Sequence, residues 1–69
     1  MTGFIEIDRD HYLIEEIIGL CIDGTEIIVI TRPNEQHSYS WNDPTEAENE
    51  YLKIKQRIEA HYLKLLHAN

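Results

Sequence analysis

Hydrophobic and polar residues alternate along much of the first two thirds of the chain, and this period of two is typical of β-strands with one buried face. Ile5 and Ile7, for example, flank Glu6 and would lie on the same side of an extended segment. Glycine, proline, asparagine and aspartate interrupt the alternation and mark turns. The pattern predicts strands over residues 4–8, 17–22, 25–31 and 36–41.

The most specific local signal is the Asp23-Gly24 pair, which lies between two runs rich in isoleucine and valine. Aspartate and glycine both tolerate positive φ, so the pair predicts an antiparallel hairpin closed by a type I′ turn with Asp23 and Gly24 at its centre. Residues 9–11 and 32–35 predict two further turns. Residues 12–14 predict a bridge or a short extended piece.

The period changes after residue 42, where a helix start is recognisable. Asp43 is suited to cap a helix, Pro44 to its first position, and Glu46 stands three residues after the cap. No helix-breaking residue follows, which predicts a helix over residues 44–67. The chain is therefore predicted to be an α+β domain, with a three- to four-stranded antiparallel β-meander and one long C-terminal α-helix packed on one face of the sheet.

The predicted helix carries more apolar surface than one sheet face needs. One seam has the spacing of a single buried face: Ala47, Tyr51, Ile54, Ile58, His61 and Leu65. A second apolar set widens it: Leu52, Tyr62, Leu63 and Leu66. A helix of about 24 residues is about 36 Å long, whereas a compact chain of this size is about 28 Å across. We expect the C-terminal end to extend beyond the sheet.

Both faces of the predicted central hairpin are also apolar. Ile18, Leu20 and Ile22 are expected to face one way and Ile17 and Cys21 the other, while Ile27 and Val29 oppose Ile28 and Ile30. A single helix covers only one face of a sheet, so the second face needs another partner. Residues 12–14 folding back over that face would be an internal solution.

The surplus apolar surface predicts a homo-oligomer, either a dimer or a small ring. The side chains expected at the interface with another copy or another protein come from the end of the helix and the second hairpin face: Tyr62, Leu63, Leu65, Leu66, Ile28 and Ile30.

Composition narrows the cellular context. Sixty-nine residues predict a single domain spanning 1–69. No apolar run reaches the ~20 residues of a membrane span, and the first residues lack the basic region of a signal peptide. A single cysteine, Cys21, argues against a disulfide-stapled secreted domain. We therefore expect a cytoplasmic protein. Its net charge of −7 argues against direct binding to nucleic acid.

Chemistry-bearing residues are few. Alternating aromatics on residues 36–41 can stack a ligand or pack under the helix, and arginine side chains suit phosphate and carboxylate groups. If a small anion binds between subunits, the expected contacts are Arg9, Arg32, His37, Tyr39 and Trp41.

No metal, cofactor or catalytic motif is recognisable. His61 and His67 are six residues apart, which places them on different sides of a helix. Glu15 and Glu16 would point to opposite faces of a strand, and no serine or cysteine has an identifiable base. We expect no enzymatic activity and no cofactor.

Two functions fit this sequence. The first is a small acidic, non-enzymatic protein-interaction module that acts as a homo-oligomer and holds a partner protein, for example a host protein, by its helix or sheet edge. The second is a small inhibitor or sequestering protein, in a phage setting for example. It would act by acidic mimicry of nucleic acid or by binding a small anionic ligand between subunits.

Overall fold

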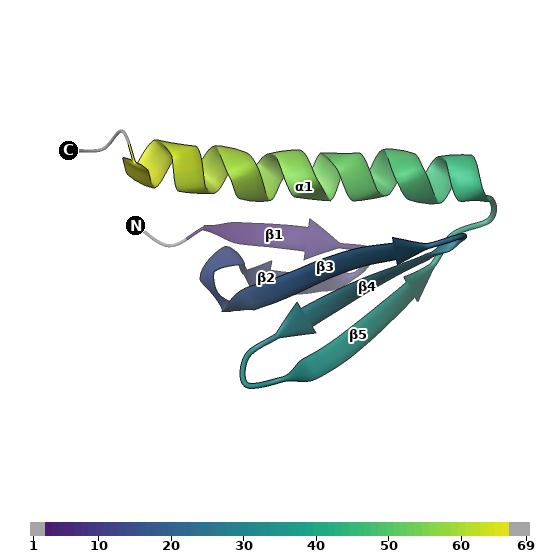
Figure 1. The fold of residues 1–69 in the computed structure, drawn as a ribbon, viewed down its shortest axis with the longest axis horizontal. Coiled ribbons are helices and arrows are strands. Elements are labelled where there is room, and N and C mark those ends of the chain that lie inside the picture. The colour runs from purple at the N-terminus through teal and green to yellow at the C-terminus, as the bar shows by residue number, and fades with distance from the viewer. Residues whose placement is uncertain (1–2, 67–69) are drawn as a thin grey trace.

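The computed structural model describes residues 3–66. Five strands form two small antiparallel sheets, and one long helix follows them (Figure 1). In chain order the elements are β1 (Phe4–Ile7), β2 (Asp10–Leu13), the 3-10 helix η1 (Ile14–Glu16), β3 (Ile17–Asp23), β4 (Glu26–Thr31), β5 (Glu35–Ser40) and α1 (Pro44–Leu66). The predicted α+β meander with a C-terminal helix is confirmed. The predicted helix end at His67 lies outside the described residues.

The meander consists of β3, β4 and β5, with β4 in the centre. The predicted hairpin of β3 and β4 is confirmed, but the predicted turn is wrong. Asp23 belongs to β3 and pairs with Glu26, so the two turn residues are Gly24 and Thr25. Of these turn residues only Gly24 has a positive φ, 63°. Glycine at the first central position is the pattern of a type II′ turn, which needs no second residue with positive φ.

A β-bulge at the start of β3 changes the predicted faces of this strand. The register shifts between Ile17, which pairs with Thr31, and Gly19, which pairs with Ile30. The extra residue places Ile17 against the core together with Leu20, whereas Ile18 becomes exposed. The expectation that Ile18 faces the same way as Leu20 is therefore wrong, because a bulge interrupts the period of two.

The second sheet is the hairpin of β1 and β2, in which Ile5 pairs with Tyr12 and Ile7 with Asp10. A tight turn at Asp8 and Arg9 joins the strands, and Asp8 has a φ of 57°. Aspartate is one of the few residues that enter this left-handed region readily. Residues 10–13 form a full strand here, where the sequence predicts only a turn and a short extended piece.

The core lies on one side of the meander. Ile27 and Val29 are fully buried there and pack with Ile5, Ile7 and Ile54. The β1–β2 hairpin and α1 therefore lie on the same side of the meander (Figure 1). This arrangement contradicts the idea that residues 12–14 fold back over the second face.

The helix begins as its sequence predicts. The Asp43 carboxylate accepts a hydrogen bond from the Glu46 backbone amide, Oδ1 to N 2.8 Å, which satisfies one of the free donors of the first turn. Along the predicted seam Ala47 and Ile54 are buried, and Ile58 is half-buried against the core. The last turns of α1 extend beyond the strands (Figure 1), as expected.

Candidate interaction surface

The open edge of β3 is the first feature of the candidate surface. Among the described strands, β3 pairs only with β4. On its other side, alternate backbone amides and carbonyls of an edge strand point away from the sheet and can pair with another strand. The bulge at Ile17–Gly19 interrupts this edge at one end and leaves Gly19–Asp23 in regular pairing with β4. Regular edge backbone of this kind has the geometry that an additional strand needs for pairing.

A groove runs between this edge and α1. We call it the β3–α1 groove; it consists of two hollows of about 270 Å³ and 380 Å³. From β3 and the following turn the lining comprises Ile17, Ile18, Gly19, Leu20, Ile22 and Gly24. From α1 it comprises Pro44, Glu48, Tyr51, Leu52, Lys55, Ile58 and Glu59. Tyr51 lines both hollows and so marks the middle of the groove.

Exposed apolar side chains concentrate along the groove and at the end of the helix. Ile18 is 51% exposed and Leu52 is 44% exposed, one on each wall of the groove. In the last turns of α1, Tyr62, Leu63 and Leu66 are also exposed. Surface of this kind in a small chain indicates a site of association. The side chain of Leu65, which the sequence places in the same set, lies outside the described residues.

The outer face of the meander, opposite the core, is less apolar than the sequence predicts. Cys21 is exposed there, and its neighbours Ile28 and Ile30 are half-buried. The Ile30 side chain leans over Gly19, where an added Cβ would come within 3.1 Å of its Cδ1. Ser38 and Gln36 continue the rows of Ile28 and Ile30 onto β5. Ile28 and Ile30 thus form a narrow strip with a polar border.

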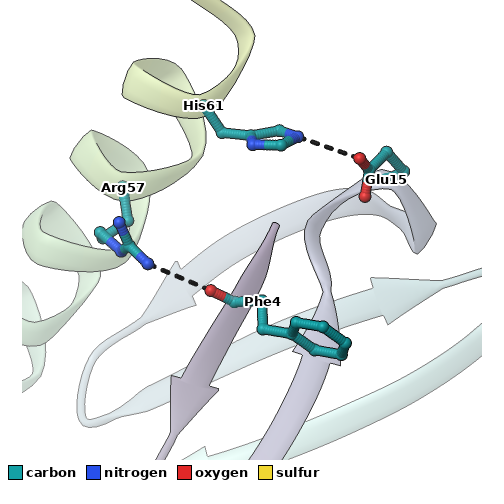
Figure 2. Close-up of polar contacts among 4 residues, drawn as sticks. All are labelled: Phe4, Glu15, Arg57 and His61. Carbon is teal, nitrogen blue, oxygen red and sulfur yellow. Dashed lines mark hydrogen bonds and ion pairs between the residues drawn. The ribbon is translucent and has the colours of Figure 1, made fainter. Parts of the chain in front are cut away.

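Two contacts hold the C-terminal half of α1 on the hairpin and η1 (Figure 2). Arg57 donates from Nη2 to the Phe4 carbonyl at 3.1 Å, and His61 Nε2 donates to Glu15 Oε1 at 3.1 Å. Gly3 passes so close to the His61 ring that an added Cβ would meet Nδ1 at 2.5 Å. A larger residue at this position would have to displace the His61 ring. The Phe4 ring points away from the helix (Figure 2).

The Glu15 carboxylate stays ionised at this contact. Its own backbone amide, and then the His61 ring, hold the pKa of the Glu15 carboxyl below its usual range against the opposing effect of burial. Glu15 Oε2 is buried and has no hydrogen-bond partner among residues 3–66. The side chain as a whole is 39% exposed, so the contact with His61 positions the helix end and is not an enclosed reactive site.

A second polar cluster joins β2 to β5. The Tyr39 hydroxyl donates to Asp10 Oδ2 at 2.7 Å. Because that hydrogen is used, the Tyr12 hydroxyl is the donor in its own hydrogen bond to Tyr39. Burial is the largest cause that raises the pKa of Tyr39, and the hydrogen bond that its hydroxyl donates to Asp10 raises it further. The Tyr12 ring also packs against His37, with 5.3 Å between ring centroids. This network fixes the hairpin on the meander.

The five residues predicted to contact an anion do not form one cluster. Tyr39 is buried, and Trp41 packs against it edge to face at a centroid distance of 6.4 Å. Arg9 lies in the β1–β2 turn and Arg32 in the β4–β5 loop, both exposed. Within residues 3–66 neither arginine side chain forms a hydrogen bond or ion pair with the aromatic residues. The anion site therefore stays a prediction.

The described part of the chain contains no group of three or more His, Cys, Asp or Glu side chains placed to hold a metal ion. Over the same residues, no helix combines the length and apolar character needed to cross a membrane. No family model, curated protein or solved structure matches the chain.

Proposed function

We propose that this protein is a small, acidic, non-enzymatic interaction module that works as a homo-oligomer. The observation that carries the proposal is the open edge of β3 beside a groove with exposed Ile18 and Leu52. A small chain that leaves both a strand edge and adjoining apolar side chains in water gains free energy when another chain covers them.

A second observation supports the same function. The hairpin β1–β2 and the helix both lie on the core side of the meander, so no described segment covers Ile28 and Ile30 on the outer face. Tyr62, Leu63 and Leu66 at the helix end are exposed as well. Any of these surfaces suits a second copy of the chain or, in the same oligomer, a host protein.

The test is the molar mass in solution, measured by size-exclusion chromatography with light scattering over a dilution series. We expect a mass at least twice the 8.2 kDa of one chain, stable to low micromolar concentration. A mass of one chain at every concentration would overturn the homo-oligomer. The variant Phe4→Ser should leave the expected mass unchanged. Phe4 is 57% exposed, but it lies on the hairpin, outside the groove, the helix end and the outer face.

A further inference from the structure

The part of β3 that pairs regularly with β4 is centred on a single residue. Pairing with β4 is regular from Gly19 to Asp23, and the middle residue of this segment is Cys21. When two identical strands pair antiparallel about a two-fold axis, a residue beside the axis faces its own copy. Paired residues in a sheet point to the same face, so a two-fold axis between two such edges must lie beside a single residue.

We propose that two copies of this chain pair through β3, antiparallel, about a two-fold axis beside Cys21. The two meanders then form one six-stranded sheet with both helices on the same face. This inference rests on the proposed homo-oligomer and names its surface. It places the contact at the strand edge and the β3–α1 groove, and not at the helix end or on the outer face.

The strand register that follows is chemically compatible. Around Cys21, Leu20 faces the partner's Ile22, and both side chains belong to the core side of the meander. Gly19 faces the partner's Asp23, a pair with no bulk to clash. Ile18, exposed at the bulge, comes next along the strand and is covered by the second copy.

The helix supplies a charge pattern that complements itself about the same axis. Along the groove α1 runs antiparallel to β3, because Ile17 shares a hollow with Ile58 and Gly24 shares the other with Pro44. The helix midpoint beside Cys21 is therefore Tyr51, the residue that lines both hollows. Glu48 and Lys55 lie three and four residues from this midpoint, on either side of it, and both are exposed.

A two-fold rotation about this midpoint brings Lys55 opposite the partner's Glu48, and the same pair recurs on the other side of the axis. The chain has a net charge of −7, so self-association needs its few bases to be placed opposite acids. Leu52, next to Tyr51 in the sequence, lies close to the axis. An extended peptide from another protein would satisfy the strand edge, but it would not account for this symmetric pairing of charges.

Oxidative cross-linking through the natural cysteine tests the strand register. Facing Cys21 residues lie about 4.5–5.5 Å apart between their Cα atoms, within the range of a disulfide. We expect diamide to convert most of the dimer to a covalent species on non-reducing gels. The matched control is the double variant Cys21→Ser with Ser38→Cys. Ser38 is exposed on the same face, two strands away, so this variant should not cross-link.

Charge exchange tests the helix contact without touching the core. Lys55→Glu places two pairs of acids together and should raise the dimer dissociation constant about tenfold. Glu48→Lys should do the same. Combining Glu48→Lys with Lys55→Glu restores both attractive pairs, and the dissociation constant should return close to that of the unchanged protein.

The outcomes separate this inference from the proposed function. A monomeric unchanged protein overturns both. A stable oligomer that does not cross-link through Cys21 and ignores the charge exchange overturns only the β3 contact, and Ile28→Lys or Leu66→Lys then locates the real interface. Equal cross-linking of the Ser38→Cys control would indicate face-to-face stacking, which also overturns the β3 contact.

Discussion

The core side of the meander differs from the open side, which comprises the β3 edge and the outer face. The difference lies in how many apolar side chains and polar groups find partners within one chain. On the core side, Ile27 and Val29 are fully buried and the hydroxyl chain from Tyr12 through Tyr39 ends on Asp10. At the β3 edge and on the outer face, Ile18 and Cys21 are exposed and strand backbone lacks a partner among the described strands.

The difference separates the residues that stabilise the fold from the residues that another chain can contact. Every described element outside the meander, namely the hairpin, η1 and α1, is used to close the core side. Nothing described is left to close the other side, so its surface is available to a partner. Substitutions on the core side should therefore change folding, whereas those on the open side should change association.

The largest expected effect compares two adjacent residues of β4. Ile27→Ala removes a fully buried side chain and should lower the free energy of unfolding by about 3 kcal/mol. Ile28→Ala, on the half-buried outer face, should cost about 1 kcal/mol or less. Chemical denaturation followed by circular dichroism measures both. Equal losses would show that the outer face is as well packed as the core, and the comparison would fail.

A smaller effect is expected at Tyr39 and depends on pH. The raised pKa of Tyr39 means that the folded protein keeps this proton while the unfolded chain releases it near pH 10.0. The stabilising contribution is thus complete below pH 10.0 and is lost as pH rises, by up to about 1.4 kcal/mol per unit.

Tyr39→Phe supplies the control. At pH 7 it should cost about 1–2 kcal/mol, because Tyr12 and Asp10 lose their shared partner. Above pH 10 its free energy of unfolding should fall less steeply with pH than that of the unchanged protein. Parallel slopes for the two proteins in urea titrations between pH 8 and 11 would contradict the buried hydroxyl network.

The smallest expected effect lies at the end of the helix. Leu63 is 54% exposed, so Leu63→Gln should change the free energy of unfolding by no more than about 0.5 kcal/mol. Urea denaturation of Lys55→Glu with and without Leu63→Gln, at a concentration where light scattering gives the mass of one chain, measures this value. A loss above 1 kcal/mol would place Leu63 in the closed part of the molecule.

Local sequence signals were sufficient for much of the fold. The helix start follows from Asp43, Pro44 and Glu46, since capping depends on residues close in sequence. The meander follows from alternation and from Gly24 between two apolar runs. β2 was missed because its residues begin with the polar Asp10 and His11, and its inward side chains find their partners on β1 and β5.

The candidate surface was anticipated only in part. Surplus apolar residues on the helix and hairpin predicted association, and Tyr62, Leu63 and Leu66 are indeed exposed. The sequence did not indicate the bulge that exposes Ile18, because the run Ile17-Ile18 looks the same in either register. The sequence did not indicate the groove either, since its two walls, β3 and α1, are separated in the chain by β4 and β5.

The sequence by itself determined β1, the three strands of the meander and the start of the helix, because periodicity and capping act over a few residues. The tertiary structure alone decided that the β1–β2 hairpin joins the helix on one side of the meander. That choice depends on Ile5 and Ile7 packing with Ile27 and Val29, and on Tyr12 reaching Tyr39. Such contacts join distant segments, and they leave the β3 edge open.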